Sequence, residues 1–173
     1  MEVAGINLLT FVGFLLTITA TVLDLIGFAT PNWSKSSTPG VEAYAGLWSY
    51  CYTEYIGSDP VCGPISDFGL EEPWFKAVQA VETIGALCLL AASVVIILKL
   101  KVFKDKTILK FVCIGCLAAA AVFTLPGVII YGVKIPGFQM NNIQMEDRFF
   151  GFAFVIIAAI IGIVASVLFC LDK

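Results

Sequence analysis

The sequence lacks histidine and has few charged residues. Histidine is absent from all 173 residues, and Asp, Glu, Lys and Arg together make up 13% of them. Without histidine there is no Ser-His-Asp or Cys-His relay and no histidine-ligated metal site. A soluble domain is about 25% charged, roughly twice what this chain offers for a water-facing surface. These absences exclude most hydrolases, kinases and nucleic-acid-binding proteins, and we expect no enzyme activity, no cofactor, no metal and no nucleic-acid partner.

Apolar residues are abundant and form 60% of the chain. They fall into four long runs, at about 8–30, 74–98, 108–133 and 149–171. A membrane-spanning helix needs roughly 20 apolar residues, and in lipid every backbone polar group must be satisfied within the segment, which favours helices. The chain is therefore predicted to be an all-α membrane protein, a four-transmembrane-helix bundle that forms a single domain over residues 1–173 in the lipid bilayer.

Basic and acidic residues lie in different loops. The loop at 99–107 and the residues just after it carry five lysines and one aspartate, whereas the loop at 31–73 carries one lysine and six acidic residues. Loops rich in Lys and Arg stay in the cytosol. The 99–107 loop and both termini are thus predicted to be cytosolic, and the loops at 31–73 and 134–148 extracellular, in a multi-pass protein of the plasma membrane.

Of the six cysteines, only Cys51 and Cys62 fall in the predicted extracellular loops, so a disulfide there has one possible connectivity. The extracellular side is oxidising, and a loop of this length cannot build a large core of its own. Closing a ring of about 12 residues stabilises a fold by roughly 3 kcal/mol. Aromatic residues around Cys51 favour strands, and residues 57–60 are typical of a turn. We expect a small antiparallel sheet closed by a Cys51–Cys62 disulfide.

Tryptophan and proline mark the ends of the predicted spans. Trp33, Trp48 and Trp74 lie near predicted membrane boundaries, where tryptophan is enriched at the level of the lipid headgroups. They are candidate interfacial anchors. Pro126 lies inside the third run, and a proline within a helix removes one hydrogen bond and commonly bends the helix. We expect a kink in the third span toward its outer end.

Two carboxyl groups, Asp24 and Glu82, lie inside predicted spans. At ~1.5 Å per residue, both are ~10 Å from the outer ends of their helices. A carboxyl group within a membrane is costly and is a candidate functional site by default. One interpretation is contact with an ion, a proton or an outer-leaflet lipid. The other is a protonated carboxyl that hydrogen-bonds across helices, to Thr17, Thr21 or Gln79.

Several residues of the first outer loop together carry a family resemblance. Trp33, the triplet Gly46-Leu47-Trp48, and the pair Cys51 and Cys62 resemble the W…GLW…C…C signature of the claudin, peripheral myelin protein, epithelial membrane protein and lens fibre membrane protein superfamily. The resemblance extends to the four spans, the large first outer loop, the short second one and the basic cytosolic turn. It implies a left-handed bundle topped by a sheet of the first outer loop, in which the two cysteines are paired.

The sequence also departs from the claudin pattern. Glu82 stands where claudins usually carry arginine, shortly after Gln79-Ala80 at the start of the second span. The chain ends at Lys173, about two residues beyond the last predicted span, so we expect no binding of PDZ scaffolds through the C-terminus. The subfamily stays open between the claudin and the myelin, epithelial or lens types.

The resemblance implies a structural protein of cell–cell contacts that associates with itself within one membrane and across the gap between membranes. Such a protein forms a paracellular barrier or a pore. Glu54 and Asp67 are candidate ion-facing residues, because excess negative charge on the outer loop raises the local concentration of cations. The alternative is an accessory protein that modulates a channel, a receptor or a membrane domain.

Overall fold

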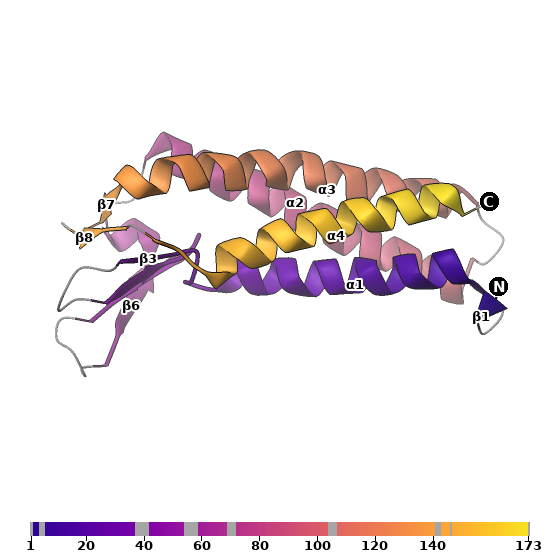
Figure 1. Ribbon diagram of the computed structural model, residues 1–173, viewed down its shortest axis with the longest axis horizontal. Helices are drawn as coiled ribbons and strands as arrows, with labels where there is room; N and C mark the ends of the chain where they lie inside the picture. Colours follow the sequence, from indigo (N-terminus) through magenta and orange to yellow (C-terminus); the bar gives the residue numbers. More distant parts are fainter. Residues whose placement is uncertain are drawn as a thin grey trace.

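The computed structural model describes residues 2–3, 6–36, 42–53, 59–68, 72–103, 107–140, 143–145 and 147–172. Within these residues four long helices form a bundle: α1 (Leu8–Ala29), α2 (Pro73–Lys101), α3 (Thr107–Lys134) and α4 (Phe150–Leu171). Each is long and apolar enough to cross a membrane, which confirms the predicted fold class. Both termini lie at one end of the bundle, and the strands from β3 onward lie at the other (Figure 1).

The ends of the helices follow from local sequence. The Asn7 side chain accepts a hydrogen bond from the Leu9 N–H at the start of α1. Pro73 begins α2, a position where the missing N–H of proline costs nothing. Lys99 and Lys101 lie in the last turn of α2, where cations interact favourably with the helix dipole. Helix α2 therefore continues past its apolar run into the residues expected to form the 99–107 loop.

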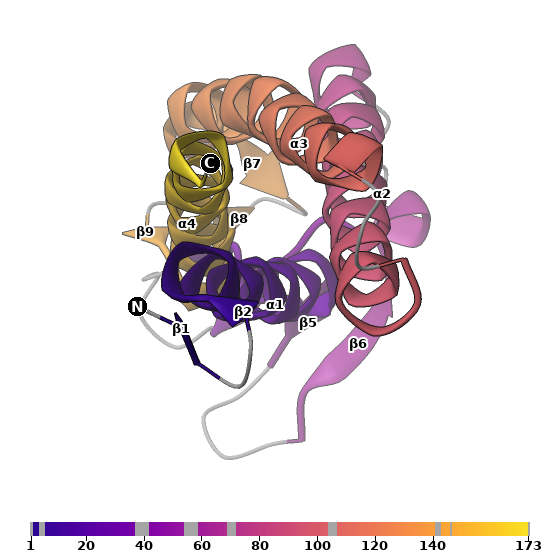
Figure 2. The ribbon, with the colours of Figure 1, turned by 90° about the vertical axis from the view of Figure 1, so that its right-hand side faces the viewer.

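The helices pack in a closed ring, with the most extensive contacts between α1 and α4 and between α2 and α3 (Figure 2). Small residues let the backbones approach, as is usual between membrane helices. A Cβ atom at Gly27 of α1 would lie 2.7 Å from the Gly151 carbonyl oxygen and 2.6 Å from Val155 Cγ2, both of α4. Only glycine permits this approach at the sheet end of the α1–α4 pair.

Buried apolar side chains form two clusters along the bundle. The cluster nearer the termini joins all four helices through side chains such as Ala20, Leu89, Leu117 and Phe169. The other lies where the helices meet the sheet and is rich in aromatic rings. Its largest fully buried side chains are Trp33, Tyr50, Phe75 and Tyr131. Apolar packing is therefore continuous from the membrane-spanning part into the sheet.

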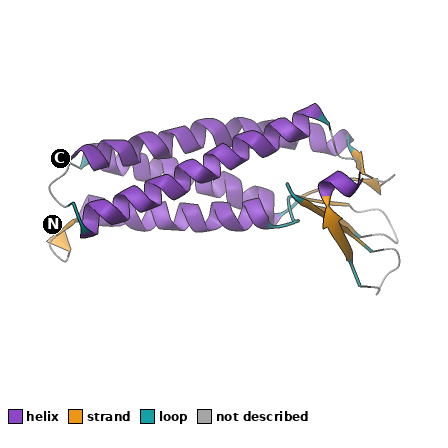
Figure 3. Cartoon of the chain, turned by 180° about the vertical axis from the view of Figure 1, so that it is seen from behind, coloured by secondary structure: helices purple, strands orange, loops and turns teal. Residues whose placement is uncertain are grey.

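The sheet is antiparallel throughout and has the strand order β6-β5-β4-β3-β9. Figure 3 shows the strands of this sheet gathered at one end of the helical bundle. Four of its strands come from the segment between α1 and α2, which confirms the predicted sheet: β3 (Ser34–Ser36), β4 (Ala43–Ala45), β5 (Ser49–Tyr52) and β6 (Val61–Pro64). The fifth, β9 (Asp147–Arg148), precedes α4 and pairs with β3. The sequence patterns did not predict this strand, and it makes both loops at this end parts of one sheet.

Short elements complete the described chain. They are β1 (Glu2–Val3) and β2 (Ile6–Asn7) near the N-terminus, the 3-10 turns η1 (Ile65–Phe68) and η2 (Ile135–Gly137), and the paired strands β7 (Gln139–Met140) and β8 (Ile143–Gln144). Helix α3 is continuous through Pro126. The kink expected at Pro126 stays a prediction.

Candidate functional site

The Cys51–Cys62 disulfide joins β5 and β6, as predicted. The two cysteines are direct partners in the register of these strands, with their Cα atoms 4.1 Å apart. Cys51 is buried, whereas Cys62 is exposed. The bond therefore links the exposed edge strand β6 to β5, the strand that contacts the core.

Trp33 attaches the sheet to the bundle. It has no exposed surface, so its assignment as an interfacial anchor in contact with lipid headgroups was wrong. The indole N–H donates to the Gly27 carbonyl oxygen of α1 at 2.7 Å. The ring contacts Tyr131 of α3 and Phe152 of α4 edge-on, with centroids 4.9 and 5.8 Å apart. One side chain thus contacts three of the helices just below the sheet.

Residues 32–34 make further hydrogen bonds to α4 through their backbone and to α3 through a side chain. The Trp33 carbonyl oxygen accepts from the Phe149 N–H at 2.9 Å, and the Asn32 carbonyl oxygen accepts from the Gly151 N–H at 2.8 Å. These bonds satisfy backbone groups where α4 begins, since that end has no side-chain cap. The Ser34 and Tyr131 hydroxyls lie 2.9 Å apart and share a hydrogen bond. The start of β3 is therefore joined to the ends of two helices.

Gly46 of the Gly-Leu-Trp triplet lies directly against the backbone that follows α1. A Cβ atom at this position would be 2.2 Å from the Thr30 carbonyl oxygen and 2.7 Å from Pro31 Cα. Backbone atoms cannot move aside as the end of a flexible side chain can. The glycine of the motif is therefore required for the strands to pass close to the end of α1.

The other two residues of the triplet face different surroundings. Leu47 is fully buried, and its carbonyl oxygen accepts from the Gln79 side-chain amide of α2 at 2.6 Å. Trp48 is 41% exposed and packs against Phe28 of α1, with ring centroids 5.2 Å apart. Together with Trp33 and Gly46, these contacts connect the signature residues to all four helices.

Tyr50 is buried on the inner side of β5 and stacks on Tyr52, with ring centroids 5.9 Å apart. Burial raises the pKa of the Tyr50 phenol to about 12, and the neighbouring Tyr52 adds to the rise. The Tyr50 phenol therefore stays neutral well above physiological pH.

Of the two candidate ion-facing residues, the structure describes only Asp67. Asp67 is exposed in η1, and its carboxylate accepts from the Ser66 hydroxyl at 3.2 Å. Glu54 lies outside the described residues. Exposure of Asp67 is compatible with a contact to solvent ions, which stays a prediction for both residues.

Asp24 and Glu82 are both buried in the bundle, each with 2% of its surface exposed. Asp24 Oδ2 and Glu82 Oε1 have no hydrogen-bond partner among the described residues. Both interpretations of these carboxyl groups stay predictions. Thr17 and Thr21 donate elsewhere, and Gln79 donates to Leu47.

Glycines accommodate the polar side chains between α2 and α3. A Cβ atom at Gly127 of α3 would lie 2.3 Å from Glu82 Oε1, and one at Gly85 of α2 would lie 2.3 Å from the Thr124 hydroxyl oxygen. Thr124 is also buried, and within the described chain its hydroxyl has no hydrogen-bond partner. Each polar group therefore packs into the space left by a glycine of the facing helix.

The fold and the site define a class of protein: an integral membrane protein with a helical bundle and a disulfide-closed sheet seated on one end. The chain matches the model of the PMP-22/EMP/MP20/Claudin family over residues 6–170 and belongs to this family. Comparison with curated proteins gave no significant match. The family match confirms the resemblance carried by Trp33, the Gly46-Leu47-Trp48 triplet and the cysteine pair.

Replacing Trp33 by phenylalanine should weaken attachment of the sheet. The Trp33→Phe variant keeps an aromatic ring but leaves the Gly27 carbonyl oxygen without its indole donor, a loss of about 1–3 kcal/mol. Thermal unfolding of the detergent-purified protein measures the effect. The control is Trp48→Phe, which changes a more exposed tryptophan. It should lower the free energy of unfolding by less than half as much as Trp33→Phe. Equal losses would contradict the role given to Trp33.

A methyl group at Gly46 should be poorly tolerated. The Gly46→Ala variant forces the backbone of Thr30 and Pro31 away from the sheet, and we expect a loss of ~1–3 kcal/mol in unfolding free energy. Gly115 of α3 is the matched control, because a Cβ atom there would meet nothing within 4 Å. Gly115→Ala should leave stability unchanged or raise it by up to about 1 kcal/mol. Comparable destabilisation by both variants would refute the close approach.

A double-mutant cycle tests the packing of Glu82 against Gly127. Gly127→Ala should destabilise the wild-type chain, because the new methyl group overlaps the Glu82 carboxyl group. In a Glu82→Ala background the same change should cost at least ~1 kcal/mol less, since the overlapping group is gone. The measurement is again thermal unfolding in detergent. Additive losses would show that the two residues do not meet.

Proposed function

We propose that this chain is a structural protein of cell–cell contacts in the plasma membrane. The observation that carries the proposal is the attachment of the sheet to the bundle: hydrogen bonds of residues 32–34 and of Leu47 connect it to all four helices. A sheet held in this way presents a fixed surface to a neighbouring molecule. No catalytic role is proposed, because the family is a structural one.

The proposed orientation places the sheet outside the cell and both termini in the cytosol. Lys99 and Lys101 end α2 at the end of the bundle remote from the sheet (Figure 1). Lysine-rich loops favour the cytosolic side. The Cys51–Cys62 disulfide belongs to an oxidising compartment. Charge and redox chemistry therefore favour the same orientation independently.

The outer surface offers features suited to association between copies of the chain. Strand β6 is an edge of the sheet, and Val61 on it is 51% exposed. An edge strand leaves backbone N–H and C=O groups available for another chain. Trp48 is also exposed and packs beside α1, where the sheet meets the bundle. We propose that copies associate laterally in one membrane through this edge and contact copies in the opposite cell through the segments 31–73 and 134–148.

The finer proposal is a barrier or a pore that favours cations. Asp67 is exposed beside this edge in η1, which directly follows β6. An exposed carboxylate next to a gap between cells raises the local cation concentration. Glu54 is included in this proposal because it is an acidic residue of the same loop in the sequence.

The test is expression of the tagged full chain in cells that have no junction strands of their own. Mixed cultures of expressing and non-expressing cells, imaged by fluorescence and freeze-fracture, should show strands concentrated where two expressing cells touch. Val61→Lys should reduce the number of junction strands without lowering surface expression of the protein. The reason is that a lysine on an edge β-strand opposes pairing with a β-strand of another chain. Val102→Lys, at an exposed valine next to Lys101, is the matched control and should behave as wild type.

A uniform signal over the plasma membrane, with no strands at contacts, would contradict the proposal and favour an accessory protein that modulates a channel or receptor. Strands that form equally well with Val61→Lys would reject the edge of β6 as the lateral contact.

A further inference from the structure

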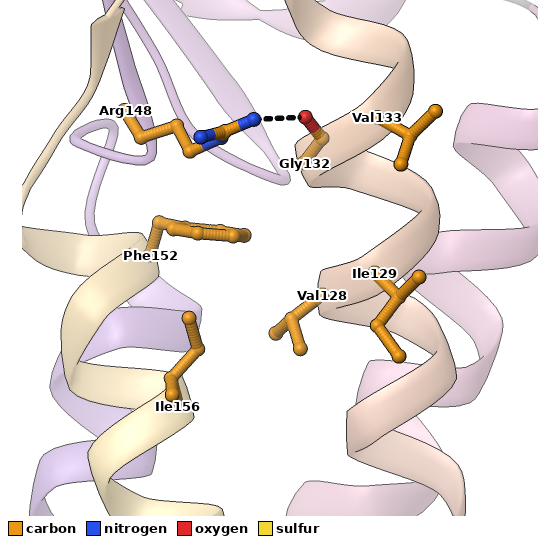
Figure 4. A pocket seen from close by; sticks show the side chains of 7 residues that line it. All are labelled: Val128, Ile129, Gly132, Val133, Arg148, Phe152 and Ile156. Carbon is orange, nitrogen blue, oxygen red and sulfur yellow. Dashed lines mark hydrogen bonds between the residues drawn. The ribbon is translucent and has the colours of Figure 1, made fainter.

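An apolar groove lies between α3 and α4 at the sheet end of the bundle. Its walls are Val128, Ile129 and Val133 of α3 and Phe152 and Ile156 of α4 (Figure 4). It has a volume of about 310 Å³. The groove is on the outside of the bundle, because the side chains of Ile129 and Val133 are 62% and 73% exposed.

The mouth of this groove carries a positive charge. Arg148 of β9 reaches over it, and one guanidinium N–H donates to the Gly132 carbonyl oxygen of α3 at 2.6 Å (Figure 4). Gly132 makes room for this arrangement, since a Cβ atom there would lie 3.2 Å from the Phe152 ring and 3.5 Å from Arg148 Nε. The guanidinium is therefore held at a fixed place directly above apolar walls.

Most of the hydrogen-bonding capacity of Arg148 is unused. A guanidinium group has five N–H donors and no acceptor. Among the described residues the Arg148 side chain has one hydrogen-bond partner, the Gly132 carbonyl oxygen, and no carboxylate forms an ion pair with it. The neighbouring acid on β9 is Asp147, which has interactions of its own. The groove thus combines apolar walls with a cation that forms no ion pair within the described part of the chain.

The membrane supplies molecules with the complementary chemistry. The exposed Ile129 lies on the outer face of a helix long enough to span the bilayer, so it would contact lipid acyl chains, whereas Arg148 lies on β9, just before α4 begins. An acyl chain fits the apolar walls, and a guanidinium binds phosphate oxygens through two parallel hydrogen bonds. Basic pockets between membrane helices are a known means of holding lipid headgroups. The volume suits part of one acyl chain rather than a whole lipid.

We propose that this groove is a binding site for one phospholipid of the leaflet next to the sheet, with an acyl chain between α3 and α4 and the phosphate on Arg148. Occupancy would tie β9 to α3 and α4 through the lipid as well as through Gly132. The proposal concerns the membrane-facing side of the bundle and does not depend on contacts between cells.

Native mass spectrometry of the full chain in a mild detergent tests the site. Dioleoyl phosphatidylcholine, dioleoyl phosphatidic acid and dioleoylglycerol are added separately, so that the acyl chains stay the same and only the headgroup changes. Both phospholipids should be retained as one molecule per chain, and dioleoylglycerol should be retained at least about tenfold less, because it has no phosphate to accept charge-assisted hydrogen bonds. This comparison needs no variant and is independent of any folding defect.

Substitution locates the phosphate contact. Arg148→Gln should reduce phospholipid retention about tenfold or more, to the level of dioleoylglycerol. Lys134 is the matched control: it is an exposed cation two residues after Gly132 and is not part of the groove wall. Lys134→Gln should retain phospholipid as wild type does. A cooperative thermal unfolding transition close to that of the wild type shows that each variant has folded.

Three results would overturn the proposal. Equal retention of dioleoylglycerol and the phospholipids would show a purely apolar surface. Equal loss with Arg148→Gln and Lys134→Gln would show attraction by overall charge. A lipid-free dimer that dissociates with Arg148→Gln would show that a second copy of the chain occupies the groove.

Discussion

The burial of the Trp33 indole against α1 is the interaction on which the arrangement of this molecule depends. Its N–H satisfies the Gly27 carbonyl oxygen near the end of α1, where backbone acceptors have no partner within the helix. Its ring fills the space between α3, α4 and the sheet. Because the same residue also donates its backbone N–H to Ala45 of β4, the sheet and the bundle share one packed core.

The bilayer determines much of the rest. Backbone groups must be satisfied within each span, so the apolar runs form long helices, and lipid gives little apolar drive for helices to associate. Close approach at glycines, as at Gly27 against α4, supplies the packing instead. The same constraint has a cost at Glu82 and Thr124: Glu82 Oε1 and the Thr124 hydroxyl oxygen pack against glycines but lack hydrogen-bond partners in the described chain.

The helices and the disulfide could be predicted because each depends on a simple count: apolar run length for the spans, and two cysteines in one oxidising loop for the bond. The burial of Trp33 could not be predicted, because a tryptophan near a membrane boundary has the same sequence environment whether it faces lipid headgroups or the protein core. Strand β9 is two residues long and leaves no alternating pattern. Tyr131 gave a usable signal, a hydroxyl within an apolar run, which in retrospect indicates a buried partner.

The order of these elements along the chain has a consequence for biosynthesis. Strands β5 and β6 precede α2, so all the residues of their hairpin and its disulfide are synthesised before those of α2. The surroundings of Trp33 include Tyr131 and Phe152, and β3 pairs with β9, all of which are synthesised later. The hairpin can close early, but it can pack against the complete bundle only after the last helix is inserted. Burial of the indole therefore marks the completion of membrane insertion.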